Sequence, residues 1–214
     1  MKNELQQVPS SIVSANPTTI NQYGEKNLHV DHAENVNHTV NLNVTYMIRS
    51  LGQKPVQVTQ TLNRDYYNLF VIGGEEFYND HFLVPKDRAL IQGTLADDLF
   101  GRLSALTSDA IKEIKTFPAL FASENTNYWG KTDTQQQTIY GLVTDIKLQG
   151  NGIKIYFQPF TYIDQQTINN IAFELGIGNR TAITELNRTH WTIKRINLIE
   201  ALTDAGISVM APTI

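Results

Sequence analysis

The sequence predicts an α+β protein, in which a β-hairpin-containing sheet is covered by helices and preceded by an Asn-rich strand-forming N-terminal segment. The first observation is the alternation of apolar and polar residues over 138–160, which is interrupted only at Gly150-Asn151-Gly152 and is typical of a hairpin. The second is apolar spacing typical of helices on both sides of that hairpin. The third is a series of short alternating pieces between Leu28 and Tyr46, which indicates strands.

The composition is that of an ordinary globular chain. Of the 214 residues, 41% are hydrophobic and 18% are charged, which excludes a charge-dominated disordered protein. The absence of cysteine excludes disulfides, thiolate metal sites and cysteine nucleophiles. A net charge of −4 argues against wholesale nucleic-acid binding. The sequence shows no signal peptide and no run of about 18 apolar residues, so we expect a cytoplasmic protein without a membrane partner.

Changes in composition divide the chain into three predicted segments. Residues 1–58 are expected to form an extended arm and a strand-rich segment. Residues 59–120 are expected to form a mixed, mainly helical middle. Residues 121–214 are expected to form an α+β C-terminal domain built on the 138–160 hairpin.

Histidines gather in the first segment, at His29, His32 and His38. Imidazole and carboxylate groups are zinc ligands, and Asp31 lies between the first two histidines. On a strand, however, His29 and Asp31 point to one face and His32 to the other, so we predict no metal site. A hydrolase or metal-dependent enzyme that uses this histidine region, or His81 farther along, stays as an alternative.

Residues 73–77 spell GGEEF, which is the signature of diguanylate cyclases. Members of that family also carry an upstream helical segment with a metal-binding Asp, and here the corresponding region is the Asn-rich segment. We therefore interpret the motif as a Gly-Gly turn with solvated glutamates.

Two helices are predicted in the middle segment. Thr94 is expected to cap a helix over 95–106, whose apolar residues fall on one face. Thr107 or Ser108 begins a second helix, which Pro118 ends.

An aromatic loop joins the middle segment to the hairpin. Tyr128 and Trp129 would wall a small-molecule pocket in which Glu124, Asn125 and Asn127 are the polar anchors. The same rings would equally pack against the base of the hairpin, which is the interpretation we favour. These five residues are the candidate ligand-binding residues of the chain.

Helix signals return after the hairpin. Asp164 is expected to cap a helix over 165–175 that Gly176 ends. Asn197 and Glu200 form a capping-box pattern at the start of the last helix.

The region between these two helices suggests a second function. A short helix over 181–188 and a strand over 190–195 are predicted, and with the preceding helix they resemble a degenerate winged helix-turn-helix at 164–195. Residues 179–195 hold four Arg or Lys against one Glu, which favours a small phosphate-facing patch. A helical pair packed on the hairpin is the alternative, and we favour it. The candidate nucleic-acid-binding residues are Thr181, Thr184, Asn187, Arg188, Lys194 and Arg195.

Four segments carry a resemblance to a known family. They are 35–44 (NVNHTVNLNV), 117–125 (FPALFASEN), 140–160 (YGLVTDIKLQGNGIKIYFQPF) and 185–207 (ELNRTHWTIKRINLIEALTDAGI). Together they resemble a family of uncharacterised bacterial proteins associated with mobile elements and phage-defence gene neighbourhoods. The resemblance implies a recognition, adaptor or regulatory role and supplies no catalytic residues.

We therefore predict a non-catalytic binding, adaptor or regulatory module of a bacterial or phage system that recognises a protein or a small ligand. A protein partner or a homo-oligomer is expected, with no cofactor. The alternative is a DNA-binding regulator that contacts nucleic acid through 179–195.

Overall fold

The structure is a computed structural model of the chain. It describes residues 42–48, 56–74, 77, 80–133, 135–178 and 182–209. The histidine region at 29–38, the Glu75–Glu76 pair of the GGEEF motif and Thr181 lie outside the described residues. Gly73 and Gly74 form a turn, as predicted for the first half of that motif.

A small antiparallel sheet is formed by the first two described strands. Strand β1 (Leu42–Ile48) pairs with β2 (Val56–Leu62), with Leu42 opposite Leu62 and Ile48 opposite Val56. The alternation of apolar and polar residues around β1 predicted a strand here, and the structure confirms it.

The main sheet has six described strands in the order β4-β7-β6-β5-β3-β8. Strands β3 and β5 at its centre are parallel, and the other four pairings are antiparallel. The sheet takes strands from both 59–120 and 121–214, so these two segments share one sheet. The bounds are β3 Tyr67–Ile72, β4 His81–Val84, β5 Pro118–Ser123, β6 Gln137–Gln149, β7 Gly152–Asp164 and β8 His190–Lys194.

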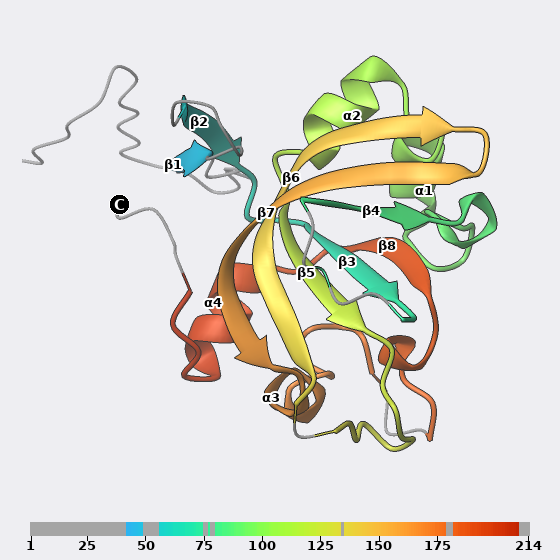
Figure 1. Cartoon of the computed structure of the whole chain (residues 1–214), viewed down its shortest axis with the longest axis vertical. Helices are drawn as coiled ribbons and strands as arrows, with labels where there is room; N and C mark the ends of the chain where they lie inside the picture. The colour runs from blue at the N-terminus through green and yellow to red at the C-terminus, as the bar shows by residue number, and fades with distance from the viewer. Residues whose placement is uncertain are drawn as a thin grey trace, which may run out of the picture. The chain divides into compact units, whose positions relative to one another are not determined.

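The long hairpin predicted from the sequence is confirmed as β6 and β7, which turn at Gly150 and Asn151 and curve across the molecule (Figure 1). Its register shifts between Tyr140 and Gly141. A Cβ added at Gly141 would lie 2.2 Å from the carbonyl oxygen of Gln158, so only glycine permits the close approach of the two backbones there.

In the part of the chain that the structure describes, four α-helices accompany the sheet, and their bounds are α1 Asp97–Leu103, α2 Ser108–Ile114, α3 Gln165–Asn170 and α4 Leu198–Asp204. Single 3-10 turns occur at η1 (Lys86–Arg88) and η2 (Glu185–Asn187). Figure 1 shows α1 and α2 toward the tip of the hairpin, and α3 at the end where β7 finishes. The α+β class is therefore correct.

Most of the predicted helix caps are confirmed. Thr107, Asp164 and Asn197 each accept a hydrogen bond from a backbone N–H two or three residues into the helix. The cap predicted at Thr94 is wrong, because α1 begins after Ala96 and the Thr94 hydroxyl donates instead to the carbonyl of Ile91.

The sheet is buried on both faces. All six residues of β3 are buried, and its five apolar residues are divided between two apolar clusters on opposite faces of the strand. Phe70 belongs to the cluster that contains the inner faces of α1 and α2, whereas Leu69 belongs to the cluster that contains those of α3 and α4. A central strand covered on both sides explains the nearly continuous apolar run in this part of the sequence.

Candidate functional site

The aromatic loop after β5 lies against the segment that precedes β8. The backbone N–H of Trp129 donates to the carbonyl of Ala182 at 2.7 Å. The side-chain amide of Asn187 donates to the carbonyl of Asn127 at 2.8 Å. The structure therefore brings together the two regions that the sequence predicted as separate ligand and nucleic-acid sites.

The buried side chain of Asn125 anchors this loop. It is 9% exposed, and its amide nitrogen donates to Asn169 at 2.8 Å while its amide oxygen accepts from Asn169 and Gln165. The Asn125 backbone N–H also donates to the carbonyl of Leu186 at 2.7 Å. We call Asn125, Gln165 and Asn169 the amide cluster. Asn125 was predicted as a ligand anchor, and in the structure its polar groups hold the loop to α3.

Glu124 is engaged within the protein as well. Its carboxylate accepts from the hydroxyl of Thr189 at 2.7 Å, and that hydroxyl accepts from the backbone N–H of Gly73 at 2.8 Å. A Cβ on Gly73 would lie 2.9 Å from the Glu124 carboxyl carbon, so a side chain at position 73 would displace this carboxylate. Glu124 therefore joins the ends of β3 and β5 to the start of β8.

The two rings of the loop point into solvent. Tyr128 is 63% exposed and Trp129 is 68% exposed, so the packing against the hairpin that we favoured is not found. Trp129 also has φ of +63°, in the left-handed region. The three other described non-glycine residues with positive φ, Phe77, Leu90 and Leu106, are buried. Trp129 thus combines a strained backbone with an exposed ring.

Two further exposed apolar side chains lie beside this loop. Phe173 is 77% exposed, Ile183 is 60% exposed, and both line one cavity. Ile183 follows Ala182, whose carbonyl accepts the hydrogen bond from the Trp129 backbone N–H. We call Tyr128, Trp129, Phe173 and Ile183 the apolar patch. An exposed cluster of this kind is typical of an interaction surface.

The sequence contained a signal for part of this patch. Phe173 lies in the stretch predicted as a helix but off its apolar face, so an exposed aromatic residue was to be expected there. The helix itself ends at Asn170, and turns continue to Gly176. Ile183 lies in the segment expected to be a short helix, and its side chain is 60% exposed.

A surface cavity of about 480 Å³ opens next to the patch. Its lining combines apolar side chains, two glycines, and the charged residues Glu185 and Arg188. Among the described residues, the Arg188 side chain is exposed and makes no ion pair or hydrogen bond. The cavity is lined by Phe173, Gly176, Ile177, Gly178, Ile183, Thr184, Glu185 and Arg188.

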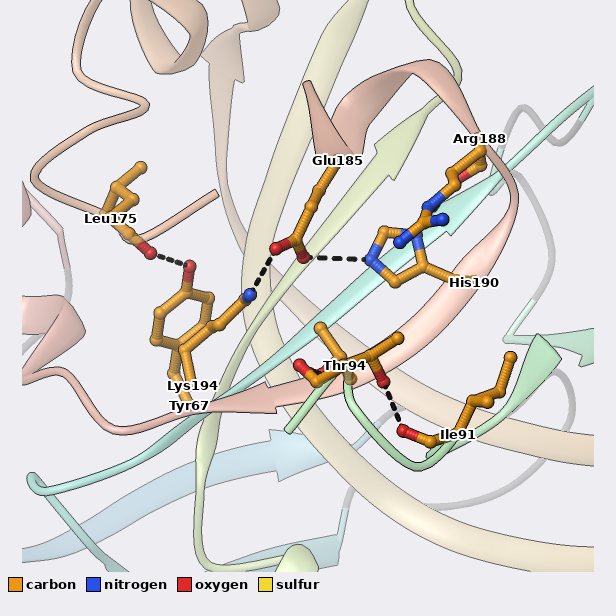
Figure 2. Close-up of polar contacts among 9 residues, drawn as sticks. Tyr67, Ile91, Thr94, Leu175, Glu185, Arg188, His190 and Lys194 are labelled. Atoms are coloured by element: carbon orange, nitrogen blue, oxygen red, sulfur yellow. Dashed lines mark hydrogen bonds and ion pairs between the residues drawn. The ribbon is translucent and has the colours of Figure 1, made fainter. Parts of the chain in front are cut away.

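Glu185 sits between the side chains of His190 and Lys194 (Figure 2). One carboxylate oxygen lies 3.2 Å from Nε2 of His190, and the other lies 2.5 Å from Nζ of Lys194. Burial disfavours the charged carboxylate, but the hydrogen bond from His190 and the Lys194 ammonium outweigh it, so the pKa of Glu185 is lowered. Glu185 is therefore a charged group whose charge is balanced inside the protein.

His190 is held on both sides. It is 2% exposed, and its Nδ1 lies 2.9 Å from the carbonyl oxygen of Arg188 while its Nε2 faces Glu185. The nearby Tyr67 hydroxyl donates to the carbonyl of Leu175 at 2.6 Å (Figure 2). Burial, and then the charge of Glu185, raise the pKa of Tyr67 well above its usual value. This group of side chains is an internal network without solvent access to the imidazole.

The second helix predicted for the helix-turn-helix is absent from residues 182–188, where the helical part is the single turn η2. The side chains of Thr184 and Asn187 close a capping box over that turn, and Arg188 is already extended toward β8. Local side-chain hydrogen bonds and the pairing of β8 with β3 thus override the weak helical spacing. The prediction of a helix over 181–188 is wrong.

The other described candidates for nucleic-acid binding make contacts within the protein. Thr184 and Asn187 hold the turn, Lys194 pairs with Glu185, and Arg195 pairs with Asp98 of α1. Of the described candidates, Arg188 alone presents an unpaired charge to solvent.

The remaining enzyme candidate is His81. Its Nδ1 lies 2.7 Å from the carboxylate of the adjacent Asp80, and both side chains are exposed. In the part of the chain that the structure describes, no three His, Asp or Glu side chains are grouped as metal ligands would be. The arrangement supplies an exposed contact between an imidazole and a carboxylate.

Comparison of the chain with protein-family models, with curated proteins and with solved structures finds no match. None of the described helices is long and apolar enough to span a membrane.

Proposed function

We propose that this protein is a non-catalytic binding module that recognises a protein partner through the apolar patch, in an adaptor or regulatory role. The observation that carries the proposal is Trp129, whose ring is 68% exposed on a backbone held at φ of +63°.

A left-handed backbone costs a residue other than glycine about 1–2 kcal/mol. At Phe77, Leu90 and Leu106 the buried side chain offsets that cost through its packing, since each is at most 5% exposed. Trp129 gains no comparable packing, and its backbone is held by the hydrogen bond to Ala182 instead. Strain of this kind, supported by the surroundings, is found at binding sites.

The loop is rigid on both sides of the ring. The side-chain amide of Gln166 donates to the carbonyl of Gly130 at 2.9 Å, and the amide cluster holds Asn125. Trp and Tyr are the residues that dominate binding energy at protein interfaces, and a preordered loop loses little entropy on binding. Tyr128 and Trp129 therefore have the chemistry and the rigidity of interface anchors.

Two observations support binding rather than catalysis. The one described histidine beside a buried acid, His190, is closed off from solvent and has both ring nitrogens engaged. His81 pairs only with exposed Asp80. The resemblance to a family of mobile-element and phage-defence neighbourhoods supports an adaptor role in a bacterial or phage system.

The test compares the full-length protein with a Tyr128→Ser/Trp129→Asn double variant. Asn is chosen at 129 because it tolerates the left-handed backbone. Proteins captured from the native host by the wild type are identified, purified and titrated against both forms. We expect the double variant to bind the purified partner at least about 30-fold more weakly, as loss of an interface hot spot of about 2 kcal/mol requires.

Leu148→Ser is the matched control, because Leu148 is 57% exposed near the tip of the hairpin. It should bind the partner like the wild type. A partner that binds the double variant as tightly as the wild type would refute the proposal. Light scattering on the wild type and the double variant identifies the case in which the partner is a second copy of the chain.

A further inference from the structure

The cavity beside the apolar patch identifies the kind of segment that the partner brings. We infer that it receives an acidic, apolar peptide segment, in which an apolar side chain enters the cavity and a neighbouring carboxylate pairs with Arg188. This inference rests on the proposed function.

The charge of the cavity is set by Arg188. Glu185 also lines it, but both of its carboxylate oxygens are occupied, one by His190 and one by Lys194. Its negative charge is therefore compensated from within the protein, and the charge left for a ligand is the positive one of Arg188.

Arg188 is suited to a carboxylate. A guanidinium group offers five N–H donors in a planar fork that matches the two oxygens of a carboxylate. Among the described arginines, Arg102 and Arg195 already pair with Glu113 and Asp98, whereas Arg188 donates to no described residue. The exposed Arg188 fork, which lines the cavity, is therefore available to an acidic partner.

The walls of the cavity are suited to an apolar side chain. Phe173 and Ile183 are exposed at its margin, and Ile177, which is 1% exposed, closes its base. Gly176 and Gly178 also line the cavity, but a Cβ on them would lie 2.9 Å from Ile196 and Ala172 respectively, so their lack of a side chain serves packing within the protein.

The exposed rings extend the same surface. Ala182, next to Ile183, accepts the hydrogen bond from the Trp129 backbone N–H, which places the backbone of the aromatic loop beside one wall of the cavity. Nucleic acid fits this surface less well, because its binding requires several unpaired cations along a phosphate backbone and the described candidates supply one.

Selection from a random-peptide display library tests the inference on the full-length protein. We expect the wild type to enrich peptides that carry Asp or Glu next to apolar residues. Arg188→Glu should lose that acidic preference and bind the best wild-type peptide about tenfold or more weakly, as loss of a charge-assisted hydrogen bond predicts. Arg188 is exposed and unpaired, so this variant should fold normally.

Lys112→Glu is the matched charge reversal, because Lys112 is exposed on α2 and pairs only with Asp109. It should select the same peptides as the wild type. Enriched peptides without an acidic preference, or identical peptides from Arg188→Glu, would refute the acidic segment while leaving the proposed function standing. If the wild type enriches no peptide, or retains a short DNA duplex that Arg188→Glu releases, both the inference and the proposed function fail.

Discussion

The two tryptophans of the chain lie in opposite surroundings. Trp191 in β8 is fully buried, stacks on Phe70 with ring centroids 5.1 Å apart, and donates its indole N–H to Asn68 at 3.2 Å. Trp129 is 68% exposed on a loop whose backbone is strained. At Trp191 the packing of the ring and the pairing of the strand support each other. At Trp129 a hydrogen bond holds the backbone, but the ring is not packed against the protein.

This difference separates stability from binding. A ring that is packed on all sides contributes to the free energy of unfolding, and its loss leaves a cavity. A ring presented on a rigid loop contributes little to folding and is available to a partner. The sheet around Trp191 is therefore the scaffold, and the loop around Trp129 is the surface that it carries.

The largest effect is expected for Trp191→Ala. Removal of the buried indole should lower the free energy of unfolding by about 3–5 kcal/mol. The shift of the midpoint in urea unfolding, followed by circular dichroism, measures this value. A loss below about 1 kcal/mol would contradict the assignment of Trp191 to the core.

The amide cluster that supports the loop should be the next most sensitive. Asn125→Ala leaves the side-chain oxygen of Asn169 without its donor and should cost about 1–3 kcal/mol. Hydrogen exchange of the Trp129 amide should quicken in the same variant, because the loop loses its anchor. Asn127→Ala is the control, since that exposed side chain makes one 3.4 Å contact with Thr126 and should change stability by less than about 0.5 kcal/mol.

Because of Glu185, the free energy of unfolding should decrease as the pH is lowered. Its pKa is lower in the folded protein than the 4.5 of a free carboxyl, so the folded state takes up the proton less readily. The stabilisation is present above pH 4.5 and is lost as pH falls through the folded pKa. Unfolding curves at decreasing pH should therefore show a smaller loss in Glu185→Gln, whereas Glu174→Gln, at an exposed position, should follow the wild type.

The smallest effect on stability is expected at Trp129. Trp129→Asn should leave the free energy of unfolding unchanged or raise it by up to about 1 kcal/mol, because Asn tolerates the left-handed backbone. Trp129→Ala removes the same ring but keeps the strain, so it should be the less stable of the two. Equal midpoints for the two variants in urea would show that no strain is stored there.

Several parts of the fold could be predicted because their hydrogen bonds are local. The caps at Thr107, Asp164 and Asn197 each bond within three residues, and the hairpin turns within two. The helix predicted over 181–188 failed for a related reason, since the side chains of Thr184 and Asn187 closed a shorter turn.

Only part of the candidate site could be predicted from the sequence. Tyr128 and Trp129 were named as candidate walls of a small-molecule pocket, but Phe173 and Glu185 were not assigned to any site. Whether a residue anchors a ligand or the fold depends on what lies across from it in space, and spacing along the chain does not contain that information.

The sequence by itself determined the α+β class, the long hairpin and most helix starts, because alternation and capping act over a few residues. Only the tertiary structure decided which polar and aromatic side chains have partners within the protein and which do not. Asn125 meets Asn169 44 residues away, and Glu124 meets Thr189 65 residues away, so both are used within the protein. The side chains of Trp129 and Arg188 find no such hydrogen-bonding or ion-pair partner among the described residues, and that is why they carry the proposed function.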